Sequence, residues 1–444
     1  MDGLERSYVH GTSAVPLSGD TIGQLFDKTV ARHPDGEALV VRHQNVRWTW
    51  SDLRREVDAL AAGLIALGLA PGDRIGIWSP NNAEWVVTQF ATAKAGLILV
   101  NVNPAYRLAE LEYALNKVGC RALITATRFK SSDYMEMLAA LASEIAAAEP
   151  GHVRAARLPD LRFVITLDAE RRPGMVTYDD VRSRGTEAET RRPADLADLL
   201  QFDDPINIQF TSGTTGAPKA STLTHHNIVN NAYFASAIME LSAQDRLCIP
   251  VPMYHCFGMV LGTLTSVGHG ATMVFPSEGF DALEVLKAVA EERCTALHGV
   301  PTMFIAELEH PEFGDFDLSS LRAGNDAGAP CAVELMKRLI GEMHLDQITI
   351  AYGMTETGPL SFQTSVHDPL ERRVTTVGQV MPHTEVKIVD PEGRVAPVDT
   401  PGELLTRGYC VMPGYWNDPE KTADAIDQAH WIRSGDIATI DADG

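Results

Sequence analysis

The chain has 444 residues, of which 45% are hydrophobic, so it can bury large cores and form more than one packing unit. It carries 37 Lys and Arg against 59 Asp and Glu, and the net charge of -22 argues against nucleic acid or an anionic membrane as a partner. Six cysteines without a CxxC spacing, and no continuous apolar stretch over residues 1–20, predict a cytoplasmic protein with free thiols and without a secretory signal or membrane anchor.

The first part of the chain alternates helical and strand-like segments. Residues 51–67 carry apolar side chains at helical spacing behind Ser51, the expected N-cap, and Pro71-Gly72 ends the unit. Strands are then expected over 74–78, 97–102 and 122–126, with helices over 81–94 and 108–118 between them. The alanine-rich segment 139–148 and the charged segment 169–198 are expected to be surface excursions.

A second alternating series follows. Strands are expected over 206–210, 271–275, 296–300 and 347–352, and helices over 224–240, 281–293 and 330–340. Residues 247–277 lack Asp, Glu, Lys and Arg, but prolines and glycines interrupt this stretch, so we expect a buried strand over 247–251 and a helix over 257–267 rather than a membrane span. After residue 374 short strands and turns predict a β-rich part.

This pattern predicts an α/β fold with two doubly wound, mainly parallel sheets that carry helices on both faces. The expected units are an α/β part over about 20–200, a second over 201–370 that holds the loop described next, and a β-rich part over 371–444.

The tract after the strand 206–210 has the composition of a phosphate-binding loop. It reads Thr211, Ser212, Gly213, Thr214, Thr215, Gly216, Ala217, Pro218 and Lys219. The glycines allow successive N–H groups to point at an anion, the hydroxyls add donors and the lysine adds a charge. The spacing is not that of Walker A, so the P-loop NTPase fold is not implied. A polar surface loop is the alternative.

Together with later tracts, this loop resembles that of the adenylate-forming (AMP-binding) superfamily, and within it most closely the medium- and long-chain acyl-CoA synthetases. Residues 252–258 (Pro-Met-Tyr-His-Cys-Phe-Gly) resemble the acid-pocket motif, Gly328-Ala329-Pro330 the adenine-edge motif, and 352–357 (Tyr-Gly-Met-Thr-Glu-Thr) the adenine-stacking and metal motif. Residues 402–404, 414–416 and 434–436 resemble later landmarks. The resemblance runs from about residue 21 to 444 and implies that 1–444 is the large N-terminal domain of such an enzyme.

The implied reaction has two steps. A carboxylate attacks the α-phosphate of ATP to give an acyl-adenylate and pyrophosphate, and the thiol of CoA then displaces AMP. Because carboxylate and triphosphate repel each other, the enzyme must supply positive charge and N–H donors, here the loop and Lys219. Mg²⁺ takes oxygen ligands, for which Glu356 is the candidate and the resemblance adds Thr211. The resemblance also gives Thr355 and His255 catalytic roles.

Nucleotide contacts are expected at three places. Tyr352 ends a predicted strand, where open α/β sheets bind ligands, and its ring can stack on adenine while Gly353 lets the backbone approach. Met354, Thr355 and the tract Gly328, Ala329, Pro330 complete the adenine side by resemblance. Asp436 is suited to accept both ribose hydroxyls. Taken alone, Tyr352 could instead be a core tyrosine at a strand end, and Asp436 could be a turn residue.

The acid is expected to be apolar. His255, Cys256, Phe257 and Gly258 offer no carboxylate to pair with an ammonium group, so no amino acid is expected. By resemblance Val300, Met303, Gly324 and Ala327 would line an apolar acyl channel. His255 is either a gate beside the adenylate or a satisfied polar core residue.

Three departures from the family pattern bear on this interpretation. Ala220 stands where glycine is common, Ser434 stands where threonine is usual, and the chain stops before the hinge and the mobile C-terminal domain with its bridging lysine. The expectation is therefore a chain that binds nucleotide with impaired catalysis. An acyl-AMP ligase that loads a carrier protein, and a non-catalytic nucleotide-binding scaffold, remain alternatives. Expected partners are the acid, ATP and CoA, without nucleic acid or integral membrane contact; the oligomeric state is open, with a homodimer compatible.

Overall fold

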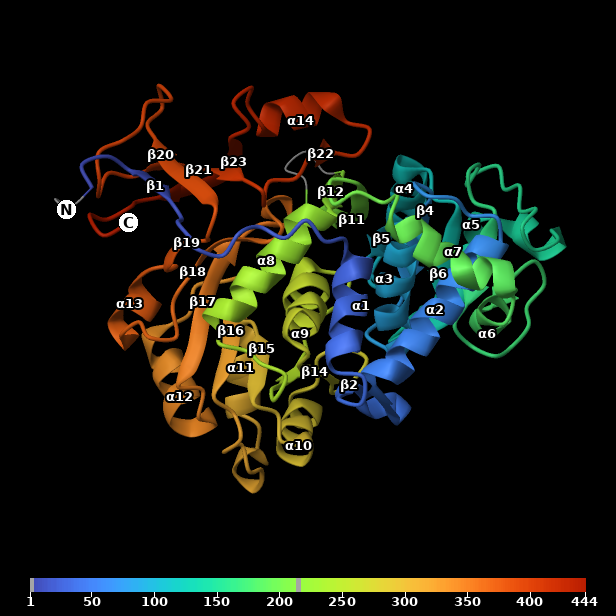
Figure 1. The fold of residues 1–444 in the computed structure, drawn as a ribbon, viewed down its shortest axis with the longest axis horizontal. Helices are drawn as coiled ribbons and strands as arrows, with labels where there is room; N and C mark the ends of the chain where they lie inside the picture. The colour runs from blue at the N-terminus through green and yellow to red at the C-terminus, as the bar shows by residue number, and fades with distance from the viewer. Residues whose placement is uncertain (1–3, 213–216) are drawn as a thin grey trace.

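The computed structural model describes residues 4–212 and 217–444. Two large sheets lie on either side of a layer of helices, and a smaller sheet that contains both β1 (Tyr8–His10) and β23 (Ile432–Ala438) lies at one end (Figure 1). The largest apolar cluster joins side chains from both large sheets to the helices between them, so the two sheets share one core.

The eight-stranded sheet is parallel except at one edge, where β12 pairs antiparallel with both of its neighbours. Its order is β10 (Val176–Thr177), β9 (Phe163–Thr166), β6 (Ala122–Thr125), β4 (Arg74–Trp78), β5 (Ile98–Val102), β11 (Pro205–Thr211), β12 (Lys219–Thr224) and β22 (Gly414–Tyr415).

The nine-stranded sheet is parallel in its centre and antiparallel at both edges. Its order is β19 (Gln379–Val380), β18 (Leu360–Gln363), β17 (Gln347–Gly353), β16 (Ala323–Ala327), β15 (Ala296–Gly299), β13 (Arg246–Cys248), β14 (Thr272–Phe275), β2 (Glu37–Val41) and β3 (Val46–Thr49). The small antiparallel sheet has the order β1, β20 (Thr384–Val389), β21 (Gly402–Gly408) and β23.

Helices cover both faces of the large sheets, as the α/β pattern predicts. The shared layer contains α1 (Ile22–Arg32), α2 (Trp50–Ala66), α3 (Ala83–Ala95), α8 (His225–Ile238), the π-helix η3 (Phe257–Leu264) and α9 (Thr265–His269). The outer faces carry α4 (Leu108–Val118) and α5 (Tyr134–Leu141) on one sheet, and α10 (Ala282–Glu292), α11 (Pro301–Leu308) and α12 (Val333–Met343) on the other. Within the shared layer, Nδ1 of His225 accepts a hydrogen bond from Ile22 N at 3.0 Å.

Strand pairing differs from the expected series at two places. The sequence predicts β11 as the first strand of the second unit, whereas β11 pairs with β5 in the eight-stranded sheet. The hairpin β2–β3, which comes early in the chain, pairs with β14 in the nine-stranded sheet. The chain crosses between the sheets at these places because apolar strands pair according to tertiary packing, which their order in the sequence does not determine.

Two local expectations are wrong. The N-cap of α2 is Thr49, whose hydroxyl accepts from Asp52 N at 3.1 Å while the Asp52 carboxylate accepts from Thr49 N at 2.9 Å, so Ser51 lies in the first turn. The charged segment 169–198 contains β10, α6 (Tyr178–Arg182) and α7 (Glu187–Ala197), and buries Val181 and Leu196. An amphipathic helix with a narrow apolar stripe has the composition of a surface loop.

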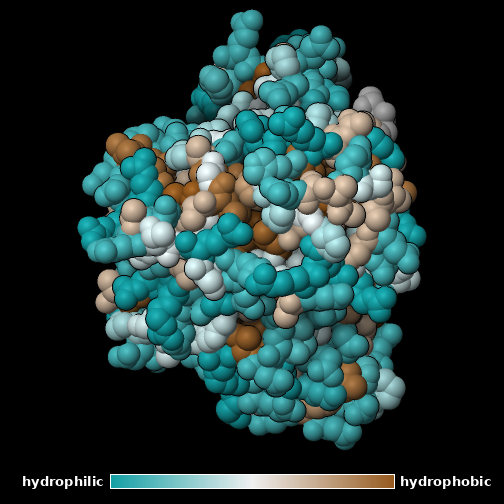
Figure 2. Space-filling view, turned by 90° about the vertical axis from the view of Figure 1, so that its right-hand side faces the viewer, coloured by the Kyte–Doolittle hydropathy of each residue, from teal (hydrophilic) through white to brown (hydrophobic). Residues whose placement is uncertain are grey.

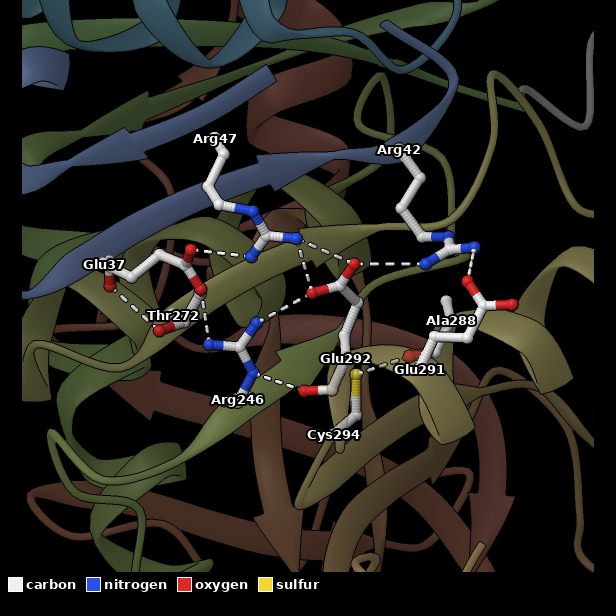
Figure 3. A network of polar contacts seen from close by, with 9 residues as sticks. All are labelled: Glu37, Arg42, Arg47, Arg246, Thr272, Ala288, Glu291, Glu292 and Cys294. Atoms are coloured by element: carbon white, nitrogen blue, oxygen red, sulfur yellow. Dashed lines mark hydrogen bonds and ion pairs between the residues drawn. The ribbon is translucent and has the colours of Figure 1, made fainter. Parts of the chain in front are cut away.

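An ion-pair network joins the hairpin β2–β3 to the rest of its sheet (Figure 3). The side chain of Glu292, 9% exposed, accepts from Arg42 at 3.1 Å, from Arg47 at 2.8 Å and from Arg246 at 3.1 Å. Glu37 accepts from Arg47 at 2.7 Å and from Arg246. A carboxylate enclosed by three guanidinium groups is well compensated for its burial.

All six cysteines lie in the described ranges, buried and unpaired, as the sequence predicts. Within those ranges no helix has both the length and the apolar character that crossing a bilayer requires. The side of the molecule that carries α6 and α7 is mostly hydrophilic, with apolar residues in several small groups (Figure 2).

Candidate active site

A cleft of about 780 Å³ opens where β16 and β17 end, beside the small sheet. Its walls include Gly328-Ala329-Pro330, Tyr352, Gly353 and Asp436. Three tracts that are far apart in the sequence therefore meet in one cavity, whose size suits a nucleotide-sized ligand. Residues 372–379 also line it, a segment to which the sequence analysis gave no role.

Tyr352 and Asp436 are in direct contact with each other on the wall of this cleft. The half-buried tyrosine donates a hydrogen bond from its hydroxyl to Asp436 Oδ2 at 2.5 Å. Burial, together with this carboxylate, raises the pKa of Tyr352 well above its usual value, so the hydroxyl stays protonated. The backbone N–H of Asp436 donates to Ser434 Oγ at 3.0 Å, and Ser434 donates to Leu404 O at 2.8 Å, so the serine makes these contacts without the methyl group of threonine.

Glycine is required at position 353 for a reason other than ligand approach. A Cβ there would lie 1.9 Å from Pro359 O, because β17 and β18 pass very close at a register shift. The expectation that Gly353 serves backbone approach to adenine is therefore not needed to explain this glycine. Gly328, by contrast, has a φ of 86°, a conformation that favours glycine.

A second group of side chains links the phosphate loop to the metal motif. Glu356, 5% exposed, lies in the short turn η5 (Thr355–Thr357) and accepts hydrogen bonds at Oε1 from Thr211 Oγ1 and from Tyr415 OH, each at 2.9 Å. Lys219 Nζ lies 4.8 Å from the centre of the Tyr415 ring. Thr211, Lys219, Glu356 and Tyr415 thus form one cluster, which we call the loop cluster.

The loop cluster fits the expected Mg²⁺ ligands. Thr211 and Glu356 present a hydroxyl and a carboxylate oxygen, hard ligands of the kind Mg²⁺ binds, in direct contact with each other. Within the described ranges no group of three or more His, Cys, Asp or Glu residues could hold a metal. Mg²⁺ takes few protein ligands and completes its shell with phosphate oxygens and water.

Of the other loop residues, Gly213, Thr214, Thr215 and Gly216 lie outside the described residues. Ser212 is exposed, Ala217 is half-buried, and Pro218 O accepts from Tyr113 OH at 3.0 Å. Ala220, the departure from the family pattern, is buried in β12 opposite Phe210, where extended backbone suits any residue.

The acid-pocket motif contacts the metal motif through sulfur. Cys256 Sγ lies 3.7 Å from Thr355 Oγ1 and 3.5 Å from His255 Nδ1. The neighbouring Cys256 raises the pKa of His255. His255 is exposed, which disagrees with the alternative of a packed core residue, and Gly258 is fixed because a Cβ would lie 2.4 Å from Pro252 O.

The expected acyl-channel residues do not all share a face. Val300 and Met303 are half-buried against the shared core, and Ala327 is buried in the same cluster. Gly324 is three residues from Ala327 along β16, so the two face opposite sides of the sheet. A Cβ at Gly324 would lie 2.0 Å from Leu297 O, so close strand packing, and not a channel wall, accounts for this glycine.

The sequence analysis missed the role of Tyr415. It identified 414–416 as a landmark without a function, whereas Tyr415 is buried, donates to Glu356 and places its ring beside Lys219. A tyrosine between Gly and Trp gives no local signal of such contacts, since its partners come from β12 and η5.

Comparison with known proteins extends these observations. The family model "AMP-binding enzyme" matches residues 26–416. The medium-chain acyl-CoA ligase ACSF2, mitochondrial, of Danio rerio is 47% identical over 441 residues, 99% of this chain and 73% of that protein. The putative acyl-CoA synthetase YngI of Bacillus subtilis (strain 168) is 44% identical over 430 residues, 96% of this chain and 78% of that protein.

A solved structure of the anthranilate CoA ligase AuaEII in complex with anthranoyl-AMP has the same fold. It matches with a TM-score of 0.83 at 23% identity, over 97% of this chain and 77% of that one. The expected α/β architecture with a small β-rich part is confirmed. The chain belongs to the AMP-binding enzyme family.

Proposed function

We propose that the protein activates a carboxylic acid, a medium- or long-chain fatty acid, with ATP to an acyl-adenylate and pyrophosphate, and then transfers the acyl group to CoA with release of AMP. The observation that carries this is the meeting of three parts: the cleft with Tyr352 and Asp436, the loop cluster, and the acid-pocket motif, which reaches the metal motif through Cys256 and Thr355. The names of the relatives, medium-chain acyl-CoA ligase and acyl-CoA synthetase, support the reaction class.

Within this proposal each part has a task. Tyr352 stacks on adenine between the strand end and Gly328-Ala329-Pro330, and Asp436 accepts from the ribose hydroxyls. Lys219 and the loop hold the β- and γ-phosphates. Mg²⁺ held by Glu356 and Thr211 would supply positive charge to the phosphates. Tyr415 positions Glu356, since its hydroxyl and that of Thr211 fix the same carboxylate oxygen.

Other features of the proposal go beyond what the family implies. We infer a division into an α/β part over about 20–200, an α/β part over 201–370 and a β-rich part over 371–444. The strands β2–β3, β11, β12, β19 and β22 pair with strands of another part. A cytoplasmic location is also part of the proposal. The Danio rerio relative is described as mitochondrial, which is said of that protein.

The proposal is tested by following both steps separately. The purified chain is incubated with ATP, Mg²⁺ and a fatty acid with and without CoA, and pyrophosphate and acyl-CoA are measured. Both products are expected in the presence of CoA, at the reduced rate that the resemblance implies for this chain, and a Glu356→Gln variant serves as the inactive control. Pyrophosphate release without acyl-CoA formation would favour the carrier-loading alternative, and nucleotide binding without pyrophosphate release would favour a scaffold.

A further inference from the structure

A row of buried polar side chains crosses the nine-stranded sheet on one face. His298, Asn325, Thr349 and Gln363 come from the consecutive strands β15, β16, β17 and β18; we call them the polar row. His298 is directly opposite Asn325, and Asn325 is opposite Thr349. Gln363 is at most 2% exposed and the other three are fully buried, so any hydrogen bond that they lack is costly.

Several atoms of the polar row have no partner among the described residues. Thr349 and Gln363 are partly satisfied, since Gln363 Nε2 donates to Thr349 Oγ1 at 3.0 Å. Both polar atoms of the Asn325 amide, Nδ1 of His298 and Oε1 of Gln363 make no hydrogen bond. Buried polar groups in native proteins are nearly always paired, so four such atoms on one sheet face need a ligand or another explanation.

The chemistry of the unpaired atoms is defined. His298 Nε2 lies 2.9 Å from Leu261 O and must donate to it, so Nδ1 carries the lone pair. Burial lowers the pKa of His298 to about 4, which keeps the ring neutral. His298 Nδ1 and Asn325 Oδ1 are therefore acceptors, and Asn325 Nδ2 is a donor. A single hydroxyl group can donate to one of these acceptors and accept from the amide.

The polar row faces the side from which the acid would enter. Phe257 of the acid-pocket motif lies with its ring centre 5.3 Å from that of His298. On β16, Asn325 shares its face with Ala327, and the next residue, Gly328, borders the nucleotide cleft. Gly328 is three residues after Asn325, a rise of about 10 Å, so Asn325 lies about that far below the cleft.

Small and unbranched side chains surround the polar row. The same sheet face carries the small side chains Ala323, Ala327 and Ala351, and Met259 and Met303 pack in the same apolar cluster. Methionine side chains are unbranched and adopt many rotamers, so they can repack around a chain that enters between the sheet and η3.

We propose that His298 and Asn325 recognise a hydroxyl group on the acyl chain, so that the preferred acid is a fatty acid hydroxylated at a distance from its carboxylate. This inference rests on the proposed function, since it deepens the substrate of the same site. The inference also excludes dicarboxylic acids. A second carboxylate beside His298 and Asn325 would place an ion in a neutral, buried site, which is unfavourable. An unsubstituted chain leaves the amide and the imidazole unpaired.

The test compares acids of one chain length. Unsubstituted, monohydroxylated and dicarboxylic acids are assayed by pyrophosphate release, with the hydroxyl moved along the chain. At its best position the hydroxy acid is expected to have a kcat/KM about 10-fold or more above the unsubstituted acid, and the dicarboxylic acid to be the poorest. No position with such a preference would overturn the inference and leave the polar row to bind ordered water only.

Variants locate the recognition. Asn325→Leu and His298→Phe are expected to lower kcat/KM for the hydroxy acid and raise it for the unsubstituted acid, which reverses the order. Thr263→Val is the matched control, because Thr263 is buried nearby in η3 and its hydroxyl bonds within the protein to Met259 O and to Gln89 at 2.8 Å. This variant should keep the wild-type preference, and equal effects of all three would contradict the assignment.

Two further measurements keep the result decisive. If no acid releases pyrophosphate, the proposed function fails, and calorimetric binding of the same acids still shows whether the hydroxyl is recognised. Asn325→Leu replaces an unpaired buried amide by an apolar group, so its melting temperature should not fall. A large fall would show that the polar row holds the sheet together, and would overturn a binding role.

Discussion

The ring of Tyr352 and the carboxylate of Asp436 should each contribute to nucleotide affinity. Because the two side chains are in contact, variants at both positions are needed to measure the two contributions separately. Tyr352→Phe keeps the ring and removes only the hydroxyl that donates to Asp436 Oδ2 at 2.5 Å. Tyr352→Ala removes the ring as well. Asp436→Ala removes the carboxylate to which we assign the ribose hydroxyls. Because the hydroxyl of Tyr352 holds the Asp436 carboxylate, we expect the hydroxyl to affect nucleotide affinity only by orienting that carboxylate.

The expected magnitudes follow from the exposure of these groups. Stacking of a base on an aromatic ring contributes about 1–3 kcal/mol, so Tyr352→Ala should weaken AMP binding by roughly 5- to 150-fold. Asp436→Ala should also cost about 1–3 kcal/mol. Asp436 is exposed, so Tyr352→Phe should cost only about 1 kcal/mol, roughly 5-fold. In the double variant Tyr352→Phe/Asp436→Ala the hydroxyl has nothing left to orient, and the loss should equal that of Asp436→Ala alone.

Titration calorimetry with AMP and with an analogue lacking both ribose hydroxyls measures these terms. Wild type should discriminate against the analogue, and Asp436→Ala should bind the two nucleotides equally. Unchanged AMP affinity in a folded Asp436→Ala protein would refute the ribose assignment. Fully additive losses in the double variant would refute the positioning role of the tyrosine hydroxyl.

Four further predictions concern the acid, the loop cluster and stability. Acid affinity should rise by up to about 0.8 kcal/mol per buried methylene until the channel is full, and an amino acid that binds better than a fatty acid of equal length would contradict this. Tyr415→Phe should lower the rate of pyrophosphate release about 10-fold with little change in AMP affinity, because it removes one of the two hydroxyl groups that hold the Glu356 carboxylate. Equal losses in both would disprove a positioning role. Glu292→Ala should lower the free energy of unfolding in urea by about 2 kcal/mol, whereas Arg171→Ala, in an exposed pair, should change it little. Burial lowers the pKa of His225 from 6.5 to about 3, so below pH 6.5 the unfolded chain takes up a proton that the folded chain excludes. The free energy of unfolding should therefore fall by about 1.4 kcal/mol per pH unit below pH 6.5. His225→Asn should reduce this dependence on pH, and an unchanged dependence would assign it to other groups.

The parts of the site that the sequence predicted are those whose chemistry is local. The tract 211–219 combines glycine, hydroxyls and a lysine within nine residues, and Tyr352 is followed directly by the turn that holds Glu356. In such tracts neighbours in sequence are neighbours in space. Residue types and spacing were therefore enough to bring Tyr352 and Glu356 together at a strand end, while the phosphate-binding role of the tract stays a prediction.

The parts that escaped prediction depend on distant partners. β16 reads Ala-Gly-Asn-Asp-Ala, which has no β-branched residue, and it is a strand because β15 and β17 pair with it on both sides. The polar row forms only when four strands pair in the observed register. The contacts of Tyr415 form only when β22 pairs with β12. Thr49 caps α2 although serine, as at Ser51, is an equally good capping residue. Only Thr49 has a carboxylate, that of Asp52, three residues later to complete a capping box.

The placement of β11 has a consequence for how the site is held together. Thr211 ends β11 in the eight-stranded sheet, and Glu356 follows β17 in the nine-stranded sheet, so their hydrogen bond joins the two sheets directly. Tyr415 of β22 makes a second bond of the same kind to the same oxygen. The metal and phosphate groups would therefore bind at a junction whose geometry depends on the shared helix layer. A change in packing between the sheets, even far from the cleft, should alter the distance between Thr211 and Glu356 before it alters either sheet.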